Sequence, residues 1–219
     1  MISLLILDLD GVVVYDAQPP YVEAAELILL HAVLDDALQR LGIPVVVLTH
    51  RSRAEAAVIL RSARLEHEVA GVMAAEDILR AALAYGTLWQ LVRKGLRKSW
   101  ALPAIEHRYG VNRGSVAFID DRLDNIEDLV DGGVGLAMHA PSGITNDGGL
   151  IGFDFDQAVR IISEWHPGQT ERIVRIAPRI IDNGAWVRTG VSATAHAGGM
   201  FNRVRRYGRR SRRLLMDRS

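Results

Sequence analysis

Cysteine is absent from this chain of 219 residues, which excludes disulfides, thiolate metal sites and thiol nucleophiles. Long apolar runs are absent too. None approaches the roughly 20 residues that cross a bilayer, and the first residues lack the basic and apolar regions of a signal peptide, so we expect a cytoplasmic protein. Lysine is scarce, because Lys94 and Lys98 are the only two among 26 basic residues. A lysine in a chain that otherwise uses arginine is therefore a candidate for a specific role.

The net charge of zero conceals a division of charge along the chain. Residues 168–219 contain twelve arginines and three acidic residues, a net charge of +9, so residues 1–167 carry −9. We expect residues 1–167 to form one folded domain and residues 168–219 to form an Arg-rich extension, partly helical or disordered. From residue 200 onward the extension has an amphipathic pattern that suits an acidic protein, nucleic acid or anionic lipid. The alternative is a disordered end that only adds solubility.

Short apolar runs alternate with segments of helical periodicity in residues 1–167. Four or five consecutive apolar residues are typical of parallel strands that are buried on both faces. The alternation predicts an α/β fold, with a doubly wound, Rossmann-like parallel sheet of about five strands flanked by helices. The expected strands are 4–7, 45–49, 69–73, 115–119 and 134–138, and the expected helices are 21–41, 52–64, 76–97, 99–109 and 154–165.

Two carboxylates follow the first expected strand, in the sequence Asp8-Leu9-Asp10-Gly11. Alternation along an extended chain points Asp8 and Asp10 the same way, and Gly11 allows a sharp turn beside them. Two carboxylates about 4 Å apart repel by roughly 4 kcal/mol at an effective dielectric near 20. A divalent cation between them, or a proton on one of them, makes that cost tolerable. The alternative interpretation is a strand followed by a solvated acidic turn.

Further polar side chains follow two other expected strands. Thr49 ends the second strand, and Asp120 and Asp121 end the strand at 115–119. Because the carboxyl ends of parallel strands lie at one edge of a sheet, we expect these side chains to converge on Asp8. Lys98 lies upstream of the acidic pair, at the start of an expected helix.

This set of motifs resembles the haloacid dehalogenase (HAD) superfamily of phosphotransferases. The superfamily has an apolar strand ending in Asp-x-Asp-Gly, a Thr or Ser after the next strand, a Lys before the fourth strand and acidic residues after it. Lys98 precedes Asp120 by 22 residues, an interval similar to that in two branches with a double Asp. These are the magnesium-dependent acidic phosphatases and the enzymes that load glyceryl groups onto carrier proteins. The resemblance covers roughly residues 3 to 140, within a catalytic domain of residues 1–167.

The resemblance implies a role for each matched residue. Asp8 would be the nucleophile that forms an aspartyl-phosphate, and Asp10 the general acid and base. Thr49 and Lys98 would bind the phosphate and offset its charge. His50 and Arg51 directly follow Thr49, and either they contact the leaving group or they are neutral linkers.

The resemblance also implies Mg²⁺, since hard oxygen ligands suit that ion. The Asp8 carboxylate, the Asp10 main-chain carbonyl and Asp120 would hold it, with Asp121 or Asp124 binding directly or through water. Asp10 further favours phosphate chemistry over carbon–halogen cleavage, because dehalogenases of the superfamily lack this second Asp.

Substrate choice in the superfamily depends on cap domains, for which this sequence leaves little room. The first gap holds one expected helix, and the second holds the helical stretch 76–97, in which Trp89 is expected to be part of the core. We therefore expect no large cap, and with it a large phosphorylated substrate or an oligomer that closes the site. Two functions remain: a Mg²⁺-dependent phosphatase of phosphate monoesters, or a phosphotransfer enzyme or adaptor docked on a carrier protein or nucleic acid through the basic extension.

Overall fold

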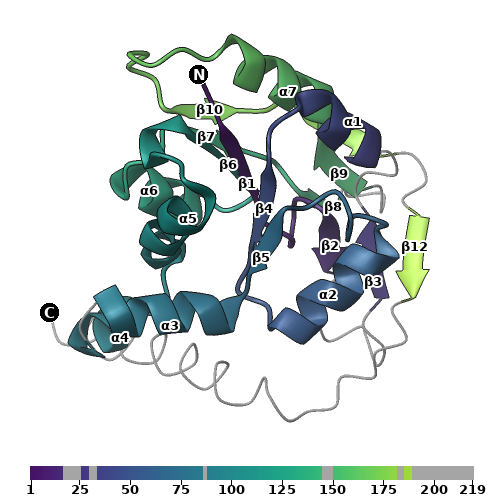
Figure 1. Ribbon diagram of the computed structural model, residues 1–219. Helices are drawn as coiled ribbons and strands as arrows, with labels where there is room; N and C mark the ends of the chain where they lie inside the picture. Colours follow the sequence, from purple (N-terminus) through teal and green to yellow (C-terminus); the bar gives the residue numbers. More distant parts are fainter. Residues whose placement is uncertain (17–25, 30–33, 86–87, 145–149, 182–184, 189–219) are drawn as a thin grey trace, which may run out of the picture.

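The computed structural model describes residues 1–16, 26–29, 34–85, 88–144, 150–181 and 185–188. Its centre is a six-stranded sheet in which every pairing is parallel, in the order β10-β7-β6-β1-β4-β5 (Figure 1). The expected parallel sheet is thus confirmed, with six strands where about five were expected. The strands are β1 (Leu4–Leu7), β4 (Val45–Leu48), β5 (Gly71–Met73), β6 (Val116–Asp120), β7 (Leu136–His139) and β10 (Ile173–Arg175).

Helices cover both faces of this sheet, and the side chains of β1 alternate between two apolar cores. Leu5 and Leu7 pack in the core that also holds residues of α1, α2 and α7, whereas Leu4 and Ile6 pack in the core built from α3, α5 and α6. This alternation explains the unbroken apolar run, since neither face of β1 meets water. The helices are α1 (Leu34–Leu41), α2 (Arg53–Ser62), α3 (Ala75–Tyr85), α4 (Leu88–Lys94), η1 (Lys98–Ala101), α5 (Leu102–Tyr109), η2 (Arg113–Ser115), α6 (Leu123–Asp131) and α7 (Phe155–Glu164).

The segment between β1 and β4 differs from the expected helix over 21–41. Of the residues described there, only α1 is helical, and Glu26–Leu29 forms the strand β3, which pairs antiparallel with β2 (Val14–Asp16) and with β12 (Ala185–Arg188). A short apolar run has no periodicity that separates strand from helix. Its pairing partner β12 lies far along the chain, which local sequence does not reveal. The rest of the expected helix, residues 21–25 and 30–33, lies outside the described residues.

Strands of the described fold also follow residue 167, after which the sequence predicts a domain boundary. Strand β10 forms the edge of the main sheet, and β11 (Pro178–Ile181) joins a second sheet with β9 (Leu150–Phe153) and β8 (Gly143–Ile144). The edge strand β10 is half-buried and contains both apolar residues and an arginine, so its sequence pattern predicts a strand only weakly. The amphipathic pattern from residue 200 onward lies outside the described residues and stays a prediction.

The region between β5 and β6 consists of α3, α4, η1, α5 and η2, and in the described residues no cap domain is formed there or after β1. Trp89 on α4 is exposed, so its expected place in the core is wrong. No helix in the described part of the chain is both long enough and apolar enough to span a bilayer.

Candidate active site

Asp8 lies at the carboxyl end of β1, where the buried strand meets a tight turn. The Asp8 amide donates to the Ile119 carbonyl at 3.0 Å, which continues the pairing of β1 with β6 by one residue. The Asp8 Oδ1 atom accepts from the Leu9 amide at 2.8 Å, and the residue is only 5% exposed. The sheet therefore fixes both the backbone and the carboxylate of this residue.

Gly11 forms the turn that follows. Its φ of +77° lies in the left-handed region that favours glycine. A Cβ atom at this position would be 2.2 Å from the Asp121 carboxyl carbon. Glycine is therefore required here twice, once for the backbone conformation and once for the space that Asp121 occupies.

Lys98 is the buried cation of the site. Its side chain is 1% exposed, and its Nζ atom lies 2.8 Å from Asp8 Oδ2 and 2.6 Å from Asp120 Oδ2. The segment that carries Lys98 is anchored by Asp128 of α6, which accepts from the Ser99 amide at 2.9 Å and from the Ser99 hydroxyl at 2.8 Å. Lys94, by contrast, is exposed on α4. Of the two lysines, the structure brings only Lys98 to the expected centre.

Asp120 is fully buried, and both of its oxygens are engaged. Oδ2 accepts from Lys98, Oδ1 accepts from the Arg122 amide at 2.9 Å, and Asn125 Nδ2 donates to both oxygens at 3.0 and 2.9 Å. Sequence reasoning did not assign Asn125 a role. The sequence feature that could have identified Asn125 is its position in the first turns of α6, directly after the acidic pair. This position brings its side-chain amide to Asp120.

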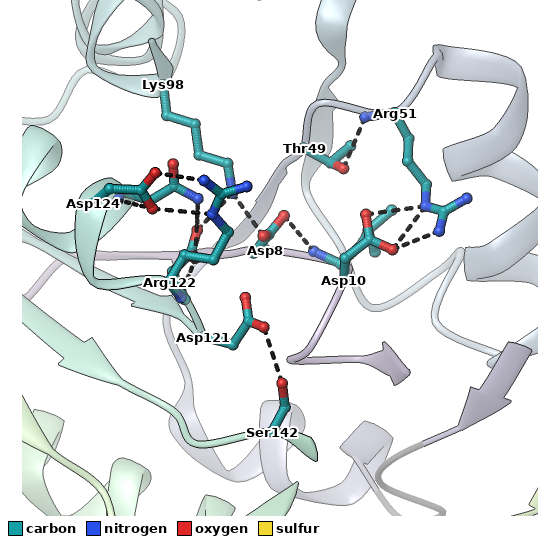
Figure 2. Close-up of polar contacts among 12 residues, drawn as sticks. Asp8, Asp10, Thr49, Arg51, Lys98, Asp121, Arg122, Asp124 and Ser142 are labelled. Atoms are coloured by element: carbon teal, nitrogen blue, oxygen red, sulfur yellow. Dashed lines mark hydrogen bonds and ion pairs between the residues drawn. The ribbon is translucent and has the colours of Figure 1, made fainter. Parts of the chain in front are cut away.

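Asp121 faces the other way and is half-buried. Its Oδ2 atom accepts from the Ser142 hydroxyl at 2.9 Å, and His139 Nε2 lies 3.0 Å from its main-chain oxygen. Its Oδ1 atom receives no hydrogen bond from the described residues. Asp124 does not join this centre, because it is exposed and pairs with the Arg122 guanidinium, with Nε 3.0 Å from Oδ1 (Figure 2).

The three carboxylates Asp8, Asp120 and Asp121 each place an oxygen within 4.8 Å of the others, an arrangement that could hold a metal ion. Burial raises the pKa of Asp8 well above its ordinary value, and Lys98 opposes that shift without cancelling it. Burial and the charge of Asp120 raise the pKa of Asp121. One lysine thus faces three acids, and a divalent cation would supply the missing positive charge. The residues therefore fit a bound Mg²⁺ ion.

Thr49, Arg51 and Asp10 form the opposite side of the site (Figure 2). Thr49 is buried, and its Oγ1 atom accepts from the Arg51 amide at 3.1 Å. The Arg51 guanidinium binds the Asp10 carboxylate through Nε at 2.8 and 3.0 Å and through Nη2 at 2.6 Å. This ion pair draws the Asp10 side chain away from Asp121, and sequence reasoning did not foresee it. His50 is exposed at the rim.

The fold and the site together define a doubly wound α/β protein with a buried acid–lysine centre at the carboxyl edge of its sheet. No family model matches the sequence, and no curated protein sequence matches it. Among solved structures, it is similar to a candidate HAD-like phosphatase from Mesorhizobium loti, with 21% identity and a TM-score of 0.49 over 77% of this chain and 90% of that one. It is also similar to a HAD-superfamily hydrolase from Geobacter sulfurreducens, with 15% identity and a TM-score of 0.47 over 64% of this chain and 89% of that one. A haloacid dehalogenase-like hydrolase from Streptococcus pneumoniae shares 13% identity, with a TM-score of 0.45 over 80% of this chain and 93% of that one. Since these identities are low, the activity must be inferred from the residues of this chain.

Proposed function

We propose that this protein is a HAD-type, Mg²⁺-dependent phosphatase that hydrolyses a phosphate monoester through an aspartyl-phosphate. The observation that carries the proposal is the placement of Asp8, a buried carboxylate whose Oδ2 atom is 2.8 Å from the buried Lys98 ammonium. A carboxylate held by a cation at the open edge of a parallel sheet is suited to attack an electrophile that itself bears negative charge. A phosphoryl group is such an electrophile.

The first step forms a bond between an Asp8 oxygen and phosphorus and breaks the bond from phosphorus to the leaving oxygen. Lys98 offsets the charge of Asp8 and of the phosphoryl oxygens, which lowers the energy of the crowded transition state. Thr49 accepts a hydrogen bond from the Arg51 amide, which leaves its own hydroxyl proton available for a phosphoryl oxygen.

Asp10 completes the proton transfers. In its protonated form it gives a proton to the leaving oxygen, and as a carboxylate it then takes one from the water that attacks the aspartyl-phosphate. The Arg51 pair fixes the orientation of the Asp10 carboxylate between these steps. We assign Arg51 this positioning role, in place of the direct contact with the leaving group considered from sequence.

Mg²⁺ would be held by the carboxylates of Asp8 and Asp121 and by the main-chain carbonyl of Asp10. When bound, it supplies positive charge that favours the ionised nucleophile and neutralises the phosphoryl oxygens. Asp120 was also expected among the ligands, and its carboxylate would be the third in this cluster. The same carboxylate holds Lys98 in place, because its Oδ2 atom accepts from Lys98 Nζ at 2.6 Å.

Release of inorganic phosphate from a panel of monoesters, with Mg²⁺ and with a chelator, tests the proposal. We expect Mg²⁺-dependent release by the wild type and a loss of several powers of ten in Asp8→Asn, because an amide of nearly the same volume cannot act as the nucleophile. Circular dichroism of the variant checks that its fold is intact. Phosphate release that persists in Asp8→Asn would remove Asp8 from the mechanism.

A further inference from the structure

The end of α3 and the following α4 expose a cluster of apolar side chains. In the described residues, seven large apolar side chains are exposed, and four of them lie between residues 83 and 92. These four lie within ten residues of the sequence, on the last turn of α3 and on α4. The four are Leu83 (57% exposed), Tyr85 (66%), Trp89 (65%) and Val92 (77%). We refer to these four residues as the α3–α4 patch.

The local geometry explains why these side chains are not in the core. Helix α3 buries Ala75, Ile78 and Ala81 against the body. The chain then continues into α4, which lies at one margin of the molecule (Figure 1). On α4, Trp89 and Val92 are three residues apart and so share one face of the helix. The Arg93 guanidinium lies 5.0 Å from the centre of the Trp89 ring.

The charge around the α3–α4 patch is opposite to that of the rest of the body. No acidic residue occurs between Asp77 and Glu106, whereas residues 78–105 contain five basic ones. Three of these five are paired with acidic residues, Arg80 with Asp77, Arg97 with Asp128 and the buried Lys98 with Asp8 and Asp120. Arg93 and Lys94 are the two exposed cations of α4. Lys94 is exposed beside the patch, and Asp77 is already paired with Arg53 and Arg80.

We propose that the α3–α4 patch docks this protein on an anionic lipid surface. A tryptophan, a tyrosine and aliphatic side chains next to exposed cations form the pattern of helices that lie in a bilayer interface. The cations complement the negative surface potential of such a membrane. More than half of the surface of each of the four residues is exposed. Such residues suit a deformable interface better than a preformed protein groove. Aliphatic residues such as Val92 do not stack on bases, which argues against single-stranded nucleic acid.

The docking surface adjoins the candidate active site through the chain. Helix α3 begins where the Ala75 amide donates to the Arg51 carbonyl at 2.9 Å, and α4 leads within a few residues to Lys98. Helix α3 thus begins beside the candidate site, and the chain returns to the site at Lys98 after α4.

Co-sedimentation of the full chain with vesicles tests the proposal. The probes are vesicles of phosphatidylcholine mixed with phosphatidylglycerol, and vesicles of phosphatidylcholine alone. We expect the wild type to bind the mixed vesicles and to bind the neutral ones weakly. The double variant Trp89→Ser/Val92→Ser should bind the mixed vesicles at least about tenfold more weakly, because each apolar side chain loses its burial. Lys94→Glu should also lose roughly tenfold or more at low salt, and its deficit should shrink as salt rises.

Ile180→Ser is the matched control, since Ile180 is 63% exposed on β11 and lies outside the patch. Every variant keeps the Arg-rich residues 189–219, so any contribution from them is constant. If the double variant binds as the wild type does, those arginines carry the binding and the proposal is wrong. Failure of the wild type to bind mixed vesicles also overturns it. The proposal is also wrong if light scattering shows a wild-type dimer, the double variant is monomeric and vesicle binding is absent. In that case the patch contacts a second copy of the chain.

Discussion

Lys98→Met is the substitution that tests the candidate site most directly, because it keeps the length of the side chain and removes its charge. The Lys98 ammonium lies 2.8 Å from Asp8 and 2.6 Å from Asp120, and its side chain is 1% exposed. Removing one partner of a buried ion pair leaves an uncompensated charge and typically costs about 3–5 kcal/mol. In a chain of this size each kcal/mol lowers Tm by roughly 2–4 °C, so we expect a fall of roughly 6–20 °C.

The activity should fall further than the stability explains. A preorganised charged donor is worth about a hundredfold to a thousandfold in kcat, and Lys98 faces both the proposed nucleophile and the incoming phosphoryl group. The assay is phosphate release from a monoester under saturating Mg²⁺, well below the Tm of the variant. Circular dichroism at the same temperature separates lost chemistry from lost fold.

Lys94→Met is the matched control for this measurement. It is the same substitution only four residues away, but Lys94 is exposed on α4. A single exposed lysine contributes little to stability, so turnover on a soluble ester and Tm should both stay near wild type. If Lys98→Met retains full turnover, or if Lys94→Met is the more damaging change, the assignment of Lys98 is wrong and the proposed mechanism loses its cation.

Three further predictions concern the metal site and the basic extension. Gly11→Ala should weaken Mg²⁺-dependent activity more than it lowers Tm, because the added Cβ would displace the Asp121 carboxyl group; isothermal titration with Mg²⁺ reports the lost affinity, and unchanged affinity would contradict the model of the site. In the metal-free protein the raised pKa values of Asp8 and Asp121 mean that the folded state binds more protons than the unfolded chain. Stability should therefore fall as pH rises, and the gain in Tm from Mg²⁺ should increase from about pH 5 to about pH 7; a gain independent of pH would argue against these two ligands. Deleting residues 200–219 should leave turnover on a small ester intact and weaken salt-dependent association with nucleic acid, whereas a collapse of turnover would make the extension part of the site.

The buried strands and the convergence of their ends could be predicted from sequence for one physical reason. A strand covered on both faces has no polar positions, so β1, β4 and β6 stand out as unbroken apolar runs. Polar residues at their carboxyl ends must then lie at one edge of the sheet. Lys98 was recognisable because lysine is rare in this chain.

Pairings between distant segments could not be predicted in the same way. Strand β3 is a short apolar run that pairs with the nearby β2 on one side and, on the other, with β12 from the far end of the described chain. The Arg51–Asp10 ion pair likewise joins residues from two strand ends, and its geometry depends on rotamers that the sequence does not specify. Trp89 shows the converse error, since tryptophan side chains are ordinarily buried but this one is exposed on α4.

The doubled aspartate at the end of β6 illustrates how a sequence motif acquires two functions. Adjacent residues at the end of an extended strand point to opposite sides. Asp120 therefore turns toward η1 and α6, where Lys98 and Asn125 engage both of its oxygens. Asp121 turns toward the loop after β1, where the missing Cβ of Gly11 leaves room for its carboxylate. The motif thus places one carboxylate against Lys98 and Asn125, and a second one where its Oδ1 atom receives no hydrogen bond from the described residues.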